Sequence, residues 1–183
     1  PNACVIVDNK PVFMGVSDIL RYSTDHTKAL LGKELEIKLS ELNEAWHAAS
    51  LERIFIENKL YQLIEGCRTR EAAYEAVDKG LEPFKSKLRR EVTIEDVQRL
   101  TELTFIRISR YDSDKADNEI KQIEADIKQT KHDLDHLVEF TIAYFERIKA
   151  KYGEGRQRRT EIRAFDTIEA WKVASSNAKL YVD

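Results

Sequence analysis

The stretch ADNEIKQIEADIKQTKHDLDHLVEFTIAYFERIKAKY, residues 116–152, has the apolar spacing of one long helix. Its apolar or weakly polar residues recur at alternating steps of three and four, which keeps them on one helix face. No Pro or Gly interrupts the stretch, and Lys, Glu, Asp and Gln fill most other positions. A face this narrow needs a partner helix. The face is made of Ile120, Ile123, Ile127, Thr130, Leu134, Leu137, Thr141, Tyr144 and Ile148.

A second stretch with the same spacing lies nearer the N-terminus, and its face holds Leu35, Leu39, Leu42, Trp46, Ala49, Arg53, Ile56, Leu60 and Leu63. Extended back to Lys28, this helix and the first would each be about 55 Å long. We therefore predict a mainly α protein, in which a long antiparallel coiled-coil arm carries a small helical knob at its tip. Paired residue numbers should sum to roughly 180, which places Trp46 near Leu134 and Leu42 near Leu137 or Val138.

The N-terminal residues predict a β-hairpin that leads into the first arm helix. Two short apolar runs, residues 4–7 and 12–14, flank a turn-forming segment. Because two strands are not stable alone, we expect the hairpin to belong to a larger sheet. Ser17 is the expected N-cap of the following helix, and Gly66 is expected to end it.

The residues between the two arm helices predict the helical knob. Thr69 can cap a short helix that runs to Gly80, and Thr93 with Asp96 resembles a capping box for a helix that extends to Tyr111. This second helix carries more apolar residues than one buried stripe needs, which favours an interface with another molecule. The candidate interface residues are Val97, Leu100, Leu103, Phe105, Ile106, Ile108 and Tyr111.

The resulting boundaries are 1–16 for the end of a preceding domain, 17–65 for the first arm region, 66–112 for the knob, 113–152 for the returning helix and 153–183 for a linker. The chain begins at Pro1 without an initiator Met, so we expect it to be a piece of a larger protein.

Composition restricts the possible partners and compartments. The net charge of −3 predicts no general affinity for nucleic acid, so a DNA contact would have to be local. Cys4 and Cys67 are too few and too far apart for a disulfide framework or a zinc site, which favours a cytoplasmic location. No apolar run reaches the ~20 residues that span a bilayer, so we expect no membrane partner.

Motifs for catalysis or metal binding are weak. Gly32 and Lys33 are followed by Glu34, and Thr27 stands where a phosphate-binding loop needs a glycine. His132 and His136 are one helical turn apart, but we interpret them as a solvated helix face because two exposed ligands make a poor metal site. We therefore assign no catalytic residue and no metal ligand.

A basic cluster follows Gly153 and Gly155, which are expected to stop the long helix. Its members, Arg156, Arg158 and Arg159, could contact a DNA backbone. The competing interpretation, that they complement the helix dipole, is about twice as common for a short basic run at a helix C-terminus.

The order of these segments resembles the bacterial type IIA DNA topoisomerase A subunits. VIVDNKPVFMGVSDIL (residues 5–20) is similar to the end of their tower domain, which runs into the first gate helix. TIEDVQRLTELTFIRISRYDSDKADNEI (93–120) resembles their knob helix and the start of the returning arm, and RRTEI (158–162) resembles the exit from that arm. The resemblance covers essentially the whole chain. In its general sequence character, the chain is more similar to topoisomerase IV subunits than to gyrase subunits. At the knob the chain departs from the gyrase Leu-Arg-Leu step, with FIRIS at residues 105–109.

This resemblance implies that the knob is the exit gate, or C-gate, of a DNA topoisomerase, where two A subunits form a homodimer. In the parent enzyme, paired tyrosines cleave duplex DNA with Mg²⁺, and the B subunit hydrolyses ATP. The segment itself would need no cofactor. None of its seven tyrosines matches the catalytic motif, so it should be inactive alone.

Two other classes remain open on the residues alone. A non-enzymatic coiled-coil scaffold or hinge of a chromosome-structuring protein would have a similar arm, although a zinc-hook version needs Cys-x-x-Cys and the knob has only Cys67. A tRNA-binding arm of a synthetase would favour a basic face, whereas acidic residues outnumber basic ones between Asp117 and Lys151.

Overall fold

A computed structural model of the chain describes residues 3–157 and Arg159. It divides into two compact units, Pro1–Phe145 and Glu146–Asp183, and the fold described below belongs to the first unless stated. The predicted class is confirmed, because the described residues are mainly helical with one short two-stranded sheet. None of the helices in these residues is long and apolar enough to cross a membrane.

The predicted hairpin is present at the N-terminus. Strands β1 (Ala3–Val7) and β2 (Lys10–Met14) pair antiparallel, with Val5 opposite Val12. Asp8 and Asn9 both have positive φ, 49° and 61°, which is the backbone of the type I′ two-residue turn that matches strand twist. The larger sheet that we expect around the hairpin stays a prediction.

Helix α1 (Val16–Glu57) is continuous over 42 residues. Its N-cap is Gly15, not the predicted Ser17, and the Gly15 carbonyl accepts the first backbone hydrogen bonds of the helix. Gly32 does not interrupt α1. A Cβ at this position would lie 3.2 Å from a methyl group of Leu137, so the glycine permits a close approach of the returning chain.

Helix α1 ends at Glu57, nine residues before the predicted end at Gly66. The side chain of Asn58 donates to the Ile54 carbonyl (2.9 Å), and Lys59 adopts a left-handed conformation with φ of 54°. A 3₁₀ helix, η1 (Leu60–Ile64), follows. Leu60 keeps the apolar spacing of α1, but its side chain is buried in the knob, which therefore begins at Asn58.

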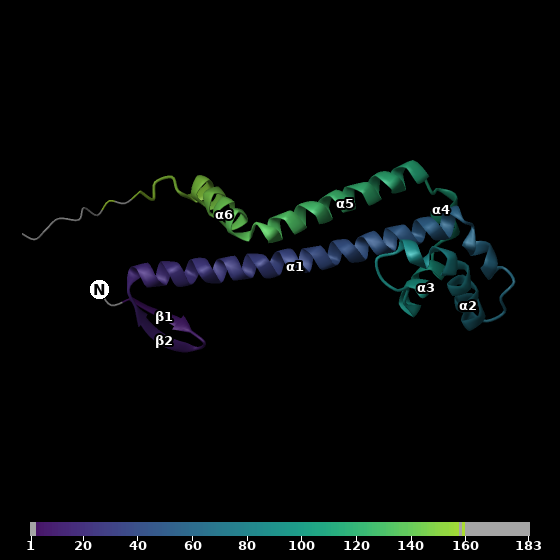
Figure 1. Cartoon of the computed structure of the whole chain (residues 1–183), viewed down its shortest axis with the longest axis horizontal. Coiled ribbons are helices and arrows are strands. Elements are labelled where there is room, and N and C mark those ends of the chain that lie inside the picture. The colour runs from purple at the N-terminus through teal and green to yellow at the C-terminus, as the bar shows by residue number, and fades with distance from the viewer. Residues whose placement is uncertain (1–2, 158, 160–183) are drawn as a thin grey trace, which may run out of the picture. The chain divides into compact units, whose positions relative to one another are not determined.

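Helix α5 (Ser113–Asp135) packs antiparallel against the C-terminal half of α1, as Figure 1 shows. The predicted register is wrong, because the residue numbers of cross-helix pairs sum to 170. Trp46 donates to Glu124 (2.9 Å) and does not lie beside Leu134. Arg53 pairs with Asp117 (2.6 Å). The register differs from the predicted one because α1 ends early and α5 begins opposite Glu57, where the Ser113 hydroxyl donates to the Glu57 carboxylate.

The apolar faces of both helices meet as predicted. Trp46, Ile120 and Ile127 are buried at the centre of a cluster, and Leu39, Leu42, Ala49 and Ile123 pack around them. We call α1 and α5 together the arm.

The sequence predicted a returning helix that is continuous to Tyr152, and this prediction is wrong. It breaks at His136, which has φ of −116° and ψ of 45°, and α6 (Leu137–Tyr152) follows. Nδ1 of His136 donates to the His132 carbonyl (2.9 Å), and the two rings stack at 4.3 Å. The His132 carbonyl therefore accepts from both the backbone N–H and the ring of His136 at the break. Gly153 follows the last residue of α6, as predicted.

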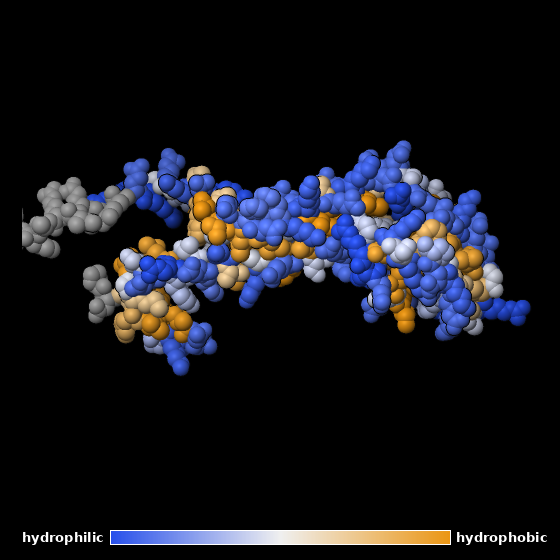
Figure 2. All heavy atoms as spheres, viewed as in Figure 1, coloured by the Kyte–Doolittle hydropathy of each residue, from blue (hydrophilic) through white to orange (hydrophobic). Residues whose placement is uncertain are grey.

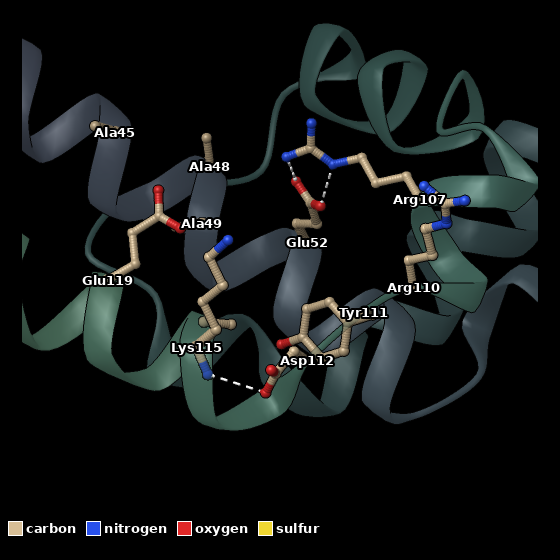
Figure 3. A pocket seen from close by; sticks show the side chains of 11 residues that line it. Ala45, Ala48, Ala49, Glu52, Arg107, Arg110, Tyr111, Asp112, Lys115 and Glu119 are labelled. Carbon is tan, nitrogen blue, oxygen red and sulfur yellow. Dashed lines mark hydrogen bonds and ion pairs between the residues drawn. The ribbon is translucent and has the colours of Figure 1, made fainter.

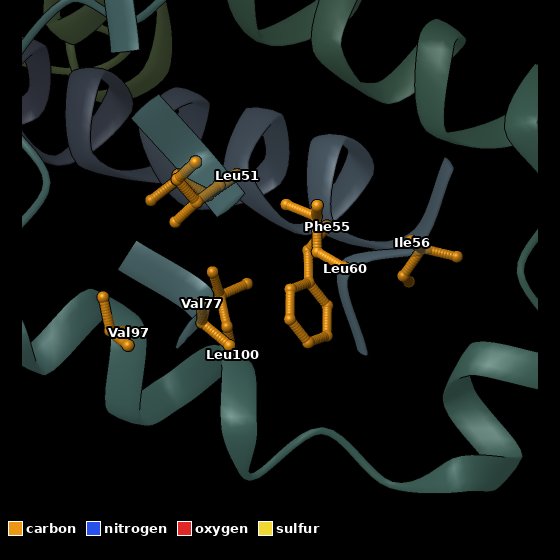
Figure 4. Packing of buried hydrophobic residues seen from close by; sticks show 8 residues of the cluster. Leu51, Phe55, Ile56, Leu60, Val77, Val97 and Leu100 are labelled. Carbon is orange, nitrogen blue, oxygen red and sulfur yellow. The ribbon is translucent and has the colours of Figure 1, made fainter. Parts of the chain in front are cut away.

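Beyond η1, the knob (residues 58–112) packs four further short helices on the end of α1. They are α2 (Arg70–Leu81), the 3₁₀ helix η2 (Glu82–Lys87), α3 (Ile94–Thr101) and α4 (Phe105–Ser109). Thr69 caps α2 and the Thr93–Asp96 capping box opens α3, as predicted. The predicted single helix to Tyr111 is wrong, because Thr104 starts a new helix. Figure 4 shows the core, made of Leu51, Phe55, Ile56, Leu60, Val77, Leu81, Val97 and Leu100.

We expect Trp46→Ala to lower the free energy of unfolding by about 3–5 kcal/mol, because it removes a large buried side chain from the arm. Urea denaturation followed by far-UV circular dichroism would measure this loss. The matched control is Ile37→Ala on the same helix, where the side chain is 61% exposed and the expected loss is below about 1 kcal/mol. Equal losses in both variants would contradict the packing described for α1 and α5.

Candidate interface on the knob and its attachment to the arm

The predicted interface residues divide into three groups in the structure. Val97 and Leu100 are buried inside the knob core, so in this conformation they are not available to another chain. Leu103, Ile108 and Tyr111 are partly buried against the same core. Only Phe105 (79% exposed) and Ile106 (63% exposed) project into solvent. On the face shown in Figure 2, small apolar patches lie among mainly hydrophilic side chains.

Phe105 and Ile106 form the first turn of α4, which we call the α4 corner. The hydroxyl of Thr104 accepts from the Arg107 backbone N–H and starts the helix. The Arg107 guanidinium then donates two hydrogen bonds to Glu52 on α1, at 2.6 and 2.8 Å (Figure 3). A bidentate pair of this kind fixes orientation as well as distance. It therefore holds the corner in place on the arm.

A groove of about 340 Å³ lies beside this ion pair, between α1 and the start of α5. Its lining includes Ala45, Ala48 and Ala49 of α1 together with basic and acidic side chains (Figure 3). The Tyr111 hydroxyl is buried there without a hydrogen-bond partner in the described residues, and burial raises the pKa of Tyr111. The lining residues pair no nucleophile with a general base, so the groove does not suggest catalysis.

Arg89 attaches the knob to both helices of the arm. Its guanidinium stacks over the Trp46 ring at 4.1 Å, a favourable cation–π geometry. It also donates to Asn43 (3.1 Å) on α1 and lies 3.8 Å from Glu124 on α5. A single side chain from the loop before α3 therefore contacts both helices of the arm.

Arg90 makes the second attachment. It donates to both carboxylate oxygens of Asp96 (2.6 and 3.1 Å) and to both of Glu44 on α1 (as short as 2.8 Å). Asp96 is 3% exposed and also accepts from the backbone and hydroxyl of Thr93, each at 3.0 Å. We call Arg89 and Arg90 with these partners the arginine clamp.

The buried carboxylate stays charged. Burial alone would raise the pKa of Asp96, but hydrogen bonds from Arg90 and Thr93 outweigh burial and hold the pKa well below its ordinary value. A hydrogen bond from Arg90 likewise lowers the pKa of Glu44. The partly exposed Arg90 guanidinium is therefore paired with two carboxylates at neutral pH.

His47 of α1 lies directly beneath the clamp and is 1% exposed. Its Nε2 is 3.4 Å from an Asp96 oxygen, yet neither ring nitrogen makes a hydrogen bond within the described residues. Burial and the charge of Arg90 lower the pKa of His47, against the opposing effect of Asp96. The ring is therefore neutral at pH 7.

Sequence reasoning missed the clamp. A signal was present. Arg89 and Arg90 stand two residues before a capping box whose acidic member needs a counter-charge, and a histidine follows the Trp of the arm face. Elsewhere, His132 and His136 are exposed, as interpreted, and both lie at the helix break. In the second unit Arg156 and Arg159 are exposed, whereas Arg158 lies outside the described residues.

We expect the free energy of unfolding to fall as the pH is lowered from 7 to 4. The folded-state pKa of His47 lies below its unfolded value of about 6.5, so below that pH the unfolded chain binds the proton more tightly. Asp96 adds a further loss below about pH 4, because its folded-state pKa is also depressed. Urea denaturation at several pH values would measure both effects.

His47→Gln isolates the histidine contribution, because glutamine does not titrate. The variant should show a flatter pH dependence between about pH 6.5 and 5, whatever its stability at pH 7. An unchanged slope in this range would show that His47 does not bind its proton differently in the two states.

Comparison with known proteins places these features in a family. The profile that describes the A subunit of DNA gyrase/topoisomerase IV matches residues 1–146. The chain is 28% identical over 182 residues to the A subunit of DNA topoisomerase 4 from Borreliella burgdorferi. This match covers the whole chain but only 29% of the relative, so the chain spans less than a third of that protein's length. The chain belongs to the family of DNA gyrase/topoisomerase IV A subunits.

Proposed function

We propose that this chain forms the exit gate of a topoisomerase IV-type A subunit, where the knobs of two subunits meet. The observation that carries the proposal is the α4 corner, where two large apolar side chains project from a surface that the arm holds in a fixed orientation. Exposed apolar side chains of this kind favour a protein interface. Family membership and the antiparallel arm support the same assignment.

The whole enzyme would change DNA topology by passing one duplex through a double-strand break in another. Cleavage by paired tyrosines with Mg²⁺ and ATP hydrolysis in a B subunit belong to parts of the enzyme outside this chain. Within residues 3–157 and 159, no three His, Cys, Asp or Glu side chains could hold a metal ion together. The proposed role of the segment is mechanical and has no step through Mg²⁺.

The arginine clamp explains how the arm could control the knob. Arg89 and Arg90 join the knob to α1 and α5 through a ring stack, an ion pair and shared hydrogen bonds. Because of these contacts, a movement of the arm would carry the knob and its α4 corner along as one body. In the proposed gate, the interface between knobs is the contact that opens, and the knob itself stays intact. The enzyme would work in the cytoplasm, where its DNA substrate lies.

We expect the 183-residue chain to sediment as a dimer at micromolar concentration and Ile106→Glu to sediment as a monomer. A glutamate would place a charge at the centre of the proposed interface, where burial without a partner is costly. Analytical ultracentrifugation over a concentration series gives the dissociation constants. Ile37→Glu is the matched control, because Ile37 is similarly exposed but lies on the arm. A monomeric parent chain would contradict the gate proposal.

The chain alone should neither cleave nor relax supercoiled DNA, and it should bind duplex DNA only weakly at physiological salt. Its net charge of −3 offers little release of counterions from the phosphate backbone. A relaxation assay and a gel-shift titration would test these points. Tight binding at physiological salt would indicate that the segment contacts DNA by itself and does more than hold a gate.

A further inference from the structure

A second surface of the knob lies between α2 and α3 and has no partner in the described residues. It is a groove of about 410 Å³ with an apolar floor and an acidic rim. Ile94 at its edge is 72% exposed. Lys85 is occupied by Asp78 (2.9 Å) and Glu82 (2.7 Å), which leaves the rim net negative. The floor is formed by the partly buried Tyr74 and Val92 above the buried Val97, and the acidic rim by Glu71, Glu75 and Asp78.

The α4 corner has the opposite character. Its exposed apolar pair, Phe105 and Ile106, is followed by Arg107 and Arg110. Arg107 is held by Glu52, whereas the Arg110 guanidinium makes no ion pair within the described residues. The corner therefore offers apolar side chains next to an available positive charge. These are the properties that the α2–α3 groove would accept.

We propose that two copies of the chain pair reciprocally, with the α4 corner of each copy seated in the α2–α3 groove of the other. This inference rests on the proposed dimerisation of the knobs and names the surfaces that meet. A two-fold axis generates both contacts at once, since the corner of one copy meets the groove of its partner and the reverse. The second copy supplies the occupant that each groove lacks.

The size of the surfaces is compatible with a stable contact. A phenylalanine side chain can bury about 150–250 Å². Two corners and two grooves, each with an isoleucine beside the aromatic ring, would together approach the ~1,000 Å² expected of a specific interface.

Charge favours this arrangement over direct contact between two α4 corners. A corner-to-corner contact would bring the Arg107 and Arg110 side chains of the two copies together, and like charges at an interface are costly. It would also leave the apolar floor of each groove open to water. Docking in the groove instead places Arg110 near the acidic rim that includes Glu75.

Cysteine cross-linking tests the pairing directly. In a Cys4→Ser, Cys67→Ser background, a chain with Ile106→Cys is co-expressed with a differently tagged chain that carries Glu75→Cys. Both positions are solvent-exposed, so both variants should fold. We expect mild oxidation to give a disulfide between the two different chains. A partner chain with Glu65→Cys, on an exposed knob position that does not line the groove, should give at least about tenfold less product.

Two outcomes would overturn the groove pairing and leave the gate proposal standing. One is a dimer whose Ile106→Cys chains cross-link mainly to each other. The other is a dimer in which Ile106→Cys forms no more product with Glu75→Cys than with Glu65→Cys. A chain that remains monomeric in ultracentrifugation would instead refute dimerisation itself, and the groove pairing with it.

A charge exchange tests the role assigned to the rim. Glu75→Arg and Arg110→Glu should each weaken dimerisation by about tenfold, because each places like charges together. The double variant should return to within about threefold of the parent chain, since the pair is restored with its signs exchanged. If the double variant is weakened by the product of the two single effects, Glu75 and Arg110 do not meet and this pairing is wrong.

Discussion

The ion pair between Arg90 and the buried Asp96 is the contact on which the arrangement of the knob depends. Asp96 caps α3 from within, and Arg90 connects that cap to Glu44 on α1. Removing Arg90 would leave the Asp96 carboxylate buried with only its hydrogen bonds from Thr93, and a buried charge without its counter-charge is strongly destabilising. The position of α3, and through it the floor of the α2–α3 groove, is therefore coupled to the arm.

The energetic contribution of the pair to stability is separate from this positioning role. Two charges lose much of their hydration on burial, and an apolar pair of the same volume can stabilise a protein equally well. An ion pair, however, accepts only one geometry, since the Arg90 fork must match two carboxylates. In the proposed gate, a knob that keeps one orientation on its arm brings the same surface to its partner at each closure.

Sequence patterns predicted the local elements well and the long-range register poorly. The hairpin, the Thr69 cap and the Thr93 capping box depend on residues close in sequence, and all are present. Spacing alone could not show that Leu60 leaves the arm face for the knob core, because both environments demand the same apolar residue. The break at His136 coincides with a side-chain hydrogen bond to the His132 carbonyl, which no apolar period encodes. The candidate interface stays a prediction, and the structure separates its residues by burial. Val97 and Leu100 were grouped with the α4 corner because all appeared to belong to one helix, and the new start at Thr104 separates them into core and surface.

This separation has a mechanical consequence for the proposed gate. Because the core residues of the knob take no part in the contact between copies, separating two knobs would expose only the corner and groove surfaces. The packing around Phe55 and Val77 would stay intact. An interface built from a few apolar anchors with charged surroundings can part and re-form without unfolding either partner, as a gate that opens in every cycle requires.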